Sequence, residues 1–324
     1  MKRILIAAGS LVFAALSGGA AAQQYPTRAI NMLVPYAAGG PTDTVARVVA
    51  QSMSKPLGQT VIVENKPSAG GILAPETVKN AKADGYTILI HHVGMATTPA
   101  LYRQLRFDPL TDFDYIGLIN DVPMTLIARA NFPAKDFKEF LAYIKANKDK
   151  VNYANAGIGA ASHLCGMLFM SAIQTDVQTI PYKGTAPAMN DLLGGQVDFM
   201  CDQTTNTTSQ IKSGKVKVYG VTSLRRVPSL PEIPTLHEQG LKNFEVGIWH
   251  GLYGPKGMPK PALDRLVAAL QATVKDEEVK KRFADLGATT YAPDKATPAA
   301  LQAHLKAEIN KWTPLIKKAG VYAD

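Results

Sequence analysis

Apolar and polar positions alternate in a regular way along the first third of the chain. Short apolar runs that end at turn residues predict strands, and longer segments with apolar residues at helical spacing predict helices. In chain order, these patterns predict a strand over Ile30–Val34, a helix over Asp43–Leu57, a strand over Val61–Val63, a helix over Ile72–Ala83 and a strand over Tyr86–Ile90. This order is typical of an α/β fold with a parallel sheet.

A second alternating series follows a long apolar stretch, Tyr115–Ala128. Asn120, Asp121 and Pro123 interrupt that stretch, which predicts one strand leaving a first lobe and a separate strand entering a second. The second series predicts helices over Phe137–Ala146, Ala161–Ser171 and Ala186–Leu193, and strands over Asn152–Ala154, Gln178–Tyr182, Val197–Cys201 and Val216–Val221.

The last third of the chain is expected to go back to the first lobe. The Pro-rich segment Pro228–Pro234 is predicted to make this return, and Leu263–Leu286 and Ala299–Lys318 are predicted as terminal helices. A chain that leaves one lobe, builds another and returns has two hinge strands. We therefore expect a first lobe of residues 23–121 and 223–324 and a second lobe of residues 122–222.

The first 22 residues follow a different pattern. A basic start, Met1–Arg3, precedes an apolar run over Ile4–Leu16 and the small residues Ala20–Ala22. This layout predicts a secretory signal peptide, residues 1–22, and a periplasmic mature protein. The alternative of a membrane anchor is disfavoured, because the apolar run is shorter than the ~20 residues that span a bilayer.

The charge of the chain changes this picture little. The sequence carries 35 Lys and Arg against 26 Asp and Glu, a net charge of +9. The basic residues are scattered, without a long run of one sign or a recognisable nucleic-acid module, so no nucleic-acid partner is expected. A solvated cationic surface that attracts anionic solutes is the simpler interpretation.

Two cysteines, Cys165 and Cys201, are separated by 36 positions and form no CxxC motif. A zinc or redox site is therefore disfavoured. One structural disulfide is compatible with an oxidising compartment, and two buried thiols are equally compatible with the sequence.

Two turns rich in Gly and Ala join a strand to a helix and contain no lysine or arginine. Small residues allow close backbone approach, and free N–H groups at a helix start favour an anion such as a carboxylate. Candidate ligand-binding residues are Tyr36, Ala38, Gly39, Gly40, Thr42 and Asp43 in the first turn and Gly157, Gly159, Ala160, Ser162 and His163 in the second. Thr42 or Asp43 could instead cap the helix, and His163 could be a packed core residue.

A third segment, Pro181–Asp198, carries a turn at Gly184 before a helix that ends at Gly194 and Gly195. Gly184, Asp202 and His92 complete the candidate ligand-binding set. For Asp202, hydrogen bonding at a strand edge is the alternative role.

These segments together resemble the Bug family, the extracytoplasmic solute receptors of tripartite tricarboxylate transporters. The resemblance covers almost the whole mature chain and includes YPTRAINMLVPYAAGGPTD, VIVENKPSAGG, ADGYTILI, NYANAGIGAASHL, PYKGTAPAMNDLLGGQVDFM and VPSLPEIPTLHEQG. Residues that match the family's two ligand loops are Tyr36, Gly40 and Asp43 in the first and Gly159, Ala160, Ser162 and His163 in the second. This chain departs from many relatives at Cys165, Cys201 and the segment His91–Gly94.

The resemblance implies a two-lobed α/β periplasmic binding protein of the type II-like clamshell class, joined by two hinge strands. Such a receptor binds a small organic acid between its lobes, largely through main-chain groups and ordered waters, without a cofactor. The expected partner is the membrane part of a tripartite tricarboxylate-type transporter, and we expect a monomer.

Two other functions are alternatives to this one. An exported hydrolase could use Ser162 with His92 or His163 and an acid, Asp43 or Asp202. The sequence contains neither a GxSxG nucleophile elbow nor an HExxH metal motif, so this function and a metal site are disfavoured. A receptor that reports ligand occupancy to a membrane sensor kinase is an alternative that needs the same closed lobes.

Overall fold

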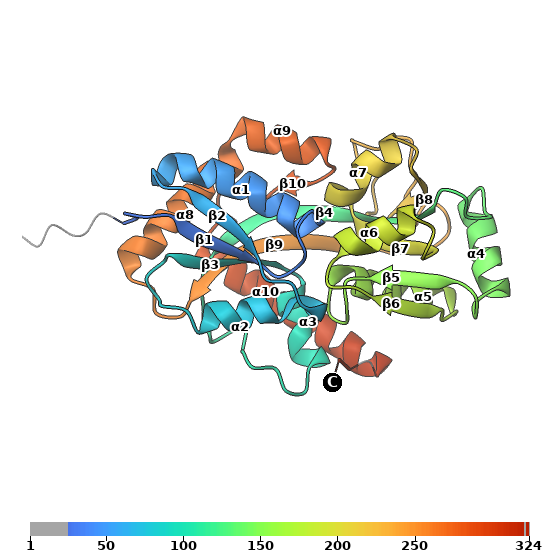
Figure 1. Ribbon diagram of the computed structural model, residues 1–324, viewed down its shortest axis with the longest axis horizontal. Coiled ribbons are helices and arrows are strands. Elements are labelled where there is room, and N and C mark those ends of the chain that lie inside the picture. The colour runs from blue at the N-terminus through green and yellow to red at the C-terminus, as the bar shows by residue number, and fades with distance from the viewer. Residues whose placement is uncertain (1–24, 321, 324) are drawn as a thin grey trace, which may run out of the picture.

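The computed structural model describes residues 25–320, 322 and 323, so the predicted signal peptide lies outside the described residues. The described chain forms two lobes that lie side by side (Figure 1). Each lobe is a strand layer with helices packed on it, as the alternating pattern predicts.

The first lobe is built on a mixed sheet in the order β2-β1-β3-β9-β4. Its strands are β1 (Ile30–Val34), β2 (Val61–Asn65), β3 (Thr87–His92), β4 (Phe113–Arg129) and β9 (Gly247–Pro255), and the short β10 (Thr289–Thr290) pairs with β4. β1 is central to the parallel part, where Asn31 lies opposite Ile62 on one side and Thr87 on the other. β9 is antiparallel to both of its neighbours.

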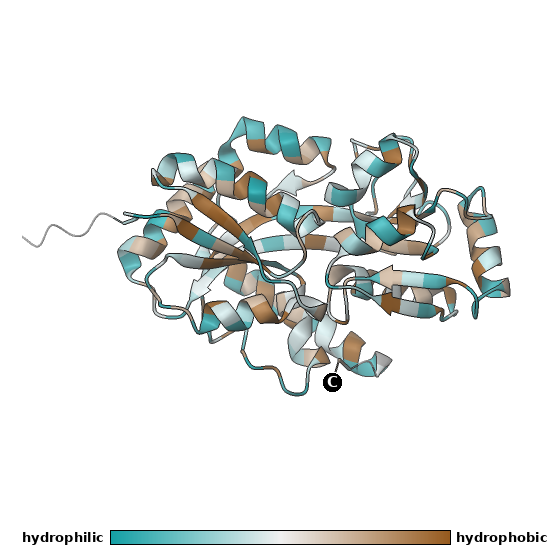
Figure 2. Cartoon of the chain, viewed as in Figure 1, coloured by the Kyte–Doolittle hydropathy of each residue, from teal (hydrophilic) through white to brown (hydrophobic). Residues whose placement is uncertain are grey.

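Helices cover both faces of this sheet (Figure 1). They are α1 (Pro41–Leu57), α2 (Leu73–Lys79), α3 (Gly94–Leu101), α8 (Lys260–Lys275), α9 (Glu277–Asp285) and α10 (Pro298–Ala319), with the short 3-10 turn η1 (Ala69–Gly71) before α2. α1 packs on α8 over one face, and α10 packs on α3 over the other. The strands are accordingly hydrophobic, whereas the outward helix positions are hydrophilic (Figure 2).

The second lobe continues the same sheet through β4, in the order β4-β7-β5-β6. Its strands are β5 (Asn152–Asn155), β6 (Gln178–Pro181), β7 (Phe199–Gln203) and β8 (Val216–Val221), and its helices are α4 (Phe137–Ala146), α5 (Ala161–Ile173), α6 (Thr185–Leu193) and α7 (Thr204–Lys212). β5 is parallel to β6 and β7, and β4 is antiparallel to β7 and β8.

The strand β4 corrects one prediction, because it is a single strand where two were expected. Its residues up to Pro123 pair with β9 in the first lobe, and those from Met124 pair with β7 and β8 in the second. Pro123 is tolerated because it occupies the last pair of the β9 ladder, where the strand changes partners and one missing N–H donor costs little. One continuous strand therefore carries the chain from lobe to lobe.

The segment that leads back to the first lobe also has contacts in the second lobe. The residues after Pro228–Pro234 still contact the second lobe, where Thr235 forms a bridge with Val221 and the ring of Phe244 meets that of Phe169. The next strand is β9, which pairs Gly247 with Pro123 in the first-lobe sheet. The two crossing strands are thus direct neighbours.

The predicted helix Leu263–Leu286 is two helices, α8 and α9. Asp276 leaves the helical conformation with ψ of 121° and accepts a hydrogen bond from the Glu278 N–H, so it caps the second helix. The sequence patterns also missed β9, α3 and α7. β9 is buried almost throughout, so it shows no alternation of polar and apolar residues.

Within the described part of the chain, no helix combines the length and apolar character needed to cross a membrane.

Candidate functional site

The first-lobe wall of the cleft is the turn between β1 and α1. α1 begins with Gly40 as its N-cap and Pro41 as its first residue, so the alternative that Thr42 or Asp43 caps this helix is wrong. Proline is favoured at this position because its missing N–H donor would be unpaired there in any case. Thr42 instead shares a hydrogen bond of 3.3 Å with His250 Nε2.

Asp43 holds this turn together. Its carboxylate accepts hydrogen bonds from Gly39 N, Arg47 Nε and Nη2, and Asn65 Nδ2, all between 2.9 and 3.0 Å. Burial raises the pKa of Asp43, but these hydrogen bonds outweigh burial and lower the pKa below its usual value. The Asp43 carboxylate is therefore stabilised entirely by donors from the first lobe.

An aromatic cluster lies beside this turn. Tyr36 stacks on His92 with ring centroids 5.0 Å apart, and His91 and His250 meet the ring of His92 edge-on. Burial lowers the pKa of His91 to about 4 and that of His250 to about 3, and it also lowers the pKa of His92. All three imidazoles are neutral at pH 7, so this wall carries no cationic histidine.

The second-lobe wall is the turn between β5 and α5. The buried Ala156 N–H donates to Ser162 Oγ at 2.9 Å, and the Tyr153 hydroxyl donates to the Ser162 carbonyl. Cys165 and Cys201 are joined by a disulfide with Cα atoms 6.1 Å apart. This bond ties α5 to β7 directly behind the wall.

A small cavity lies between these two walls. The first lobe lines it with Tyr36, Pro41, Thr42 and His92, and the second lobe with Ala156, Ala160, Ala161, Ser162, Thr185, Asp202 and Gln203. Among the described residues, no lysine or arginine lines this cavity.

The structure thus brings together six of the candidate residues: Tyr36, Thr42, His92, Ala160, Ser162 and Asp202. The other candidates lie in the adjoining turns and do not line the cavity: Ala38, Gly39, Gly40, Asp43, Gly157, Gly159, His163 and Gly184. His163 Nδ1 accepts a long hydrogen bond of 3.5 Å from Gly159 N, and burial lowers its pKa to about 4.

Sequence reasoning missed five lining residues: Pro41, Ala156, Ala161, Thr185 and Gln203. Thr185 could have been found, because it follows Gly184 in the same turn-to-helix setting as Ser162. Gln203 gave no signal, because the start of α7 was not predicted.

Four helices begin at this cavity. Their N-caps are Gly40 for α1, Ala160 for α5, Gly184 for α6 and Gln203 for α7, and none of the four uses its side chain to cap the helix. The start of each helix carries a partial positive charge and backbone N–H groups that lack an intrahelical partner. The cavity therefore favours an anion without a cationic side chain.

Asp202 is the exception in this otherwise neutral lining. It is 1% exposed, and its carboxylate accepts hydrogen bonds from Gln203 N at 2.8 Å and from Asn206 Nδ2 at 2.6 Å. Burial raises the pKa of Asp202 to about 6, although these bonds and the nearby Thr185 hydroxyl favour its ionised form. The Thr185 hydroxyl itself makes no hydrogen bond of good geometry among the described residues.

The two lobes touch around the cavity. Lys183 accepts a hydrogen bond from Ala37 N at 3.2 Å, and Ala156 accepts one from Gly70 N at 3.3 Å. The Thr97 hydroxyl donates to the Gly159 carbonyl across the same boundary, at 3.2 Å. The structure is therefore a closed arrangement of the lobes.

Glycines make this close approach possible. Gly157 has φ of +92°, and a Cβ added there would lie 2.6 Å from Gly70 N and 2.9 Å from the Cα of Ala69. Gly184 is similarly close, since its Cβ would lie 3.0 Å from Ala37 N. These candidate residues act at the lobe boundary, where a side chain would hold the lobes apart.

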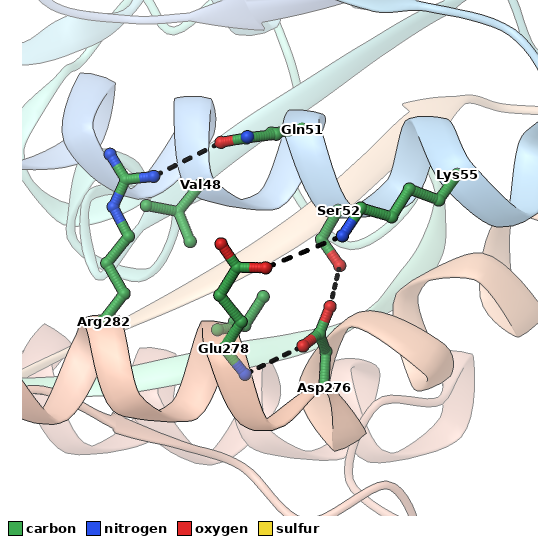
Figure 3. Close-up of a pocket in the computed structure, with 8 residues that line it drawn as sticks. Val48, Gln51, Ser52, Lys55, Asp276, Glu278 and Arg282 are labelled. Carbon is green, nitrogen blue, oxygen red and sulfur yellow. Dashed lines mark hydrogen bonds and ion pairs between the residues drawn. The ribbon is translucent and has the colours of Figure 1, made fainter.

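A second hollow, on the first lobe between α1 and α9, is not comparable (Figure 3). Its polar groups bind one another, with Ser52 donating to Asp276, Lys55 paired with Glu278 at 3.7 Å, and Arg282 donating to Gln51. These contacts fasten α9 to α1 and leave few polar groups for a ligand.

The cavity lacks the arrangement of a hydrolase. Ser162 Oγ is engaged by Ala156 N, and no hydrogen bond joins Ser162 to a histidine in the described residues. No group of three or more His, Cys, Asp or Glu side chains in the described part of the chain could hold a metal ion. The geometry is that of a binding site.

Two α/β lobes joined by crossing strands, with a cavity between uncapped helix starts, define the class of periplasmic solute-binding proteins of the type II-like clamshell fold. Residues 45–321 match the family model described as the tripartite tricarboxylate transporter family receptor, and the chain belongs to that family. The resemblance seen in the sequence is therefore confirmed. The protein is a solute-binding receptor of that transporter type and not an enzyme.

Known proteins of this kind are similar over nearly their whole length. The solved periplasmic binding protein BugD is 57% identical with a TM-score of 0.90, over 92% of this chain and 99% of that chain. MatC of Rhodopseudomonas palustris, solved with bound malate, is 38% identical with a TM-score of 0.87, over 90% and 100%. A UPF0065 protein in the TAR-I ttuE-ttuC' intergenic region of Agrobacterium vitis is 48% identical, over 93% of this chain and 87% of that protein.

Proposed function

We propose that this receptor is exported through its N-terminal signal peptide, residues 1–22, and captures a small organic acid in the cavity between its lobes. The convergence of four uncapped helix starts on that cavity is the observation that carries this proposal. The carboxylate is held by backbone N–H groups, hydroxyls and bridging waters, because no cationic side chain among the described residues lines the cavity.

The closed lobes then present one joint surface to the membrane subunits of the transporter. A relative, MatC, was solved with malate, which supports a carboxylate as the class of solute. We propose a monomer in which the second lobe comprises residues 122–222 together with residues 223–246, because Thr235 and Phe244 contact that lobe. Reporting of ligand occupancy to a sensor kinase would use the same closed surface.

A thermal-shift screen of carboxylic acids tests the proposal. An acid that binds only the folded protein stabilises it by about 2.7 kcal/mol at a hundredfold excess over its Kd, which is a readily measured rise in Tm. Amines and neutral sugars of similar size should leave Tm unchanged. If no acid raises Tm at millimolar concentration, the proposed function is wrong.

A pair of variants places the site between the lobes. Gly157→Ala should abolish the shift, because its Cβ would meet Gly70 N across the lobe boundary. Gly195→Ala is the matched control, since Gly195 also has positive φ, +73°, but its Cβ would contact nothing within 4 Å. Equal loss of binding in both variants would contradict closure around the solute.

A further inference from the structure

The turn between β5 and α5 uses part of its backbone inside its own lobe. The N–H groups of Ala156 and Gly157 donate to Ser162 Oγ at 2.9 Å and to Asn155 Oδ1 at 2.8 Å. The Gly157 carbonyl accepts a hydrogen bond from the Ala160 N–H at 3.1 Å. These groups are therefore satisfied whether or not the first lobe is close.

The remaining carbonyls of this turn accept hydrogen bonds from the first lobe. The donor and acceptor pairs are Gly70 N with Ala156 O at 3.3 Å, Thr97 Oγ1 with Gly159 O at 3.2 Å, and Tyr102 Oη with Ile158 O at 3.0 Å. We call these three hydrogen bonds the interlobe latch. A buried carbonyl needs a hydrogen-bond partner, so the latch favours the closed arrangement, in which the first-lobe donors are within reach.

Contacts within the first lobe hold the donors of the latch in position. Thr97 lies in α3 and is 0% exposed, and the Tyr102 hydroxyl also lies 3.5 Å from the Ala69 carbonyl of its own lobe. Gly70 has φ of +69°, and a Cβ added there would overlap the Tyr102 hydroxyl. The Tyr36 hydroxyl, on the wall of the cavity, donates to the Gly70 carbonyl at 3.4 Å.

The latch lies beside the cavity and not in it. Gly70, Thr97 and Tyr102 do not line the cavity, whereas Ala156 and Ala160, at the two ends of the second-lobe turn, do. A hydrogen bond that joins the lobes without contacting the solute stabilises the closed arrangement equally for every solute. Such a bond lowers the apparent Kd of all solutes by one factor, because it raises the population of the arrangement that binds them tightly.

We propose that Tyr102 and Thr97 are positioning residues that set the affinity of the receptor for its solutes through the interlobe latch. They tighten the binding of each solute by the same factor and do not select among solutes. Selection is left to the residues that line the cavity. This inference rests on the proposed function, because it requires a solute on which the lobes close.

Calorimetry on Tyr102→Phe, which removes only the hydroxyl, tests the inference. The probes are malate, succinate, glutarate and each acid identified by the thermal-shift screen. For every probe that binds the wild type, Kd should rise about fivefold, as for the loss of one net hydrogen bond. The dissociation rate should rise by the same factor and the association rate should stay unchanged, because the latch forms after the solute has entered.

Matched variants separate the latch from general stability. Tyr115→Phe is the control, because the Tyr115 hydroxyl donates to the Pro109 carbonyl at 2.8 Å within the first lobe. It should lower Tm but keep the wild-type Kd of every acid. Thr97→Val should weaken binding as Tyr102→Phe does, and Thr97→Ser, which keeps the hydroxyl, should bind within about twofold of the wild type. Each variant is first checked for a cooperative thermal transition.

The outcomes are distinct. An unchanged Kd in Tyr102→Phe, or equal weakening in Tyr115→Phe, would overturn the inference and leave the proposed function intact. A loss that differs by more than about threefold between acids would also overturn it, because Tyr102 would then act on the solute and not on closure. Failure of all acids to bind the wild-type protein would overturn the proposed function and this inference together.

Discussion

Two buried aspartates on opposite sides of the cleft have pKa values shifted in opposite directions. Asp43, in the first lobe, accepts hydrogen bonds from Gly39, Arg47 and Asn65, and its pKa lies below the usual value. Asp202, in the second lobe, receives bonds only from uncharged donors, and burial raises its pKa to about 6. Both side chains are hidden from solvent, but Asp202 lies deeper in the protein and has no cation beside it, whereas Arg47 accompanies Asp43.

The two walls of the cavity therefore differ in how far their polar groups are hydrogen-bonded within the protein. In the first-lobe wall, the Asp43 carboxylate accepts all of its hydrogen bonds from residues of the same lobe. The second-lobe wall is held by the disulfide of Cys165 and Cys201, and Gln203 Oε1 in this wall has no hydrogen-bond partner among the described residues. The disulfide therefore stabilises a wall that contains a buried acceptor without a hydrogen-bond partner.

Removal of that tie should have the largest effect on stability. The double variant Cys165→Ala, Cys201→Ala opens a loop of 36 residues and should lose about 4 kcal/mol of unfolding free energy in urea. A reductant should lower the stability of the wild-type protein and leave the double variant unchanged. Equal stability of the oxidised wild type and the variant would show that the disulfide does not support the second lobe.

Asp202→Asn should change the pH dependence of stability. The folded pKa of about 6 exceeds the usual 3.8, so the wild type is fully stabilised below pH 4 and loses stability as the pH rises through 6. Relative to the wild type, the variant should gain up to about 3 kcal/mol between pH 4 and pH 7, since each pKa unit corresponds to 1.36 kcal/mol. Urea unfolding of both proteins at four pH values measures this, and a difference independent of pH would contradict it.

Asp43→Asn should behave in the opposite sense. The lowered pKa gives stability that is present above the unfolded value of 3.8 and is lost as the pH falls through the folded pKa. The variant should therefore lose about 2 kcal/mol at pH 7, as for hydrogen bonds to a charged group, and less below pH 4. If both aspartate variants shift stability in the same direction with pH, the contrast between the two walls is wrong.

Ser162→Ala should have the smallest effect on stability of these four changes. It removes the acceptor of the buried Ala156 N–H and should cost about 1 kcal/mol of stability. Ser213→Ala is the control, because the Ser213 hydroxyl binds the Gln210 carbonyl at the exposed end of α7 and its loss should be within about 0.5 kcal/mol. Equal costs for the two serines would mean that the second-lobe turn does not depend on Ser162.

Much of the fold could be predicted from the sequence, because β1, α1 and α4 have strong local periodicity. The continuity of β4 could not, since Asn120, Asp121 and Pro123 look like a break until β9, β7 and β8 supply partners. Pairing between distant strands is a property of the assembled sheet and leaves no local pattern.

The site was predicted in part for a similar reason. Tyr36 and Ser162 lie in turns whose composition is itself a signal, so they could be named in advance. Gln203 could not be predicted, because only the position of β7 in the folded protein places it at the cavity. The role of Asp43 could not be predicted either, because it depends on hydrogen bonds from Arg47 and Asn65 to the same carboxylate. Composition locates a turn, but only the tertiary structure shows which groups are already satisfied.

Small-angle X-ray scattering measures whether the two lobes close on the solute. The radius of gyration of the wild-type protein should fall when the acid found by the thermal-shift screen is added to saturation, because binding shifts the population to the closed arrangement seen here. Gly157→Ala should keep the larger radius with or without the acid. An unchanged wild-type radius at saturation, with binding verified in the same sample, would contradict closure of the two lobes around the bound acid.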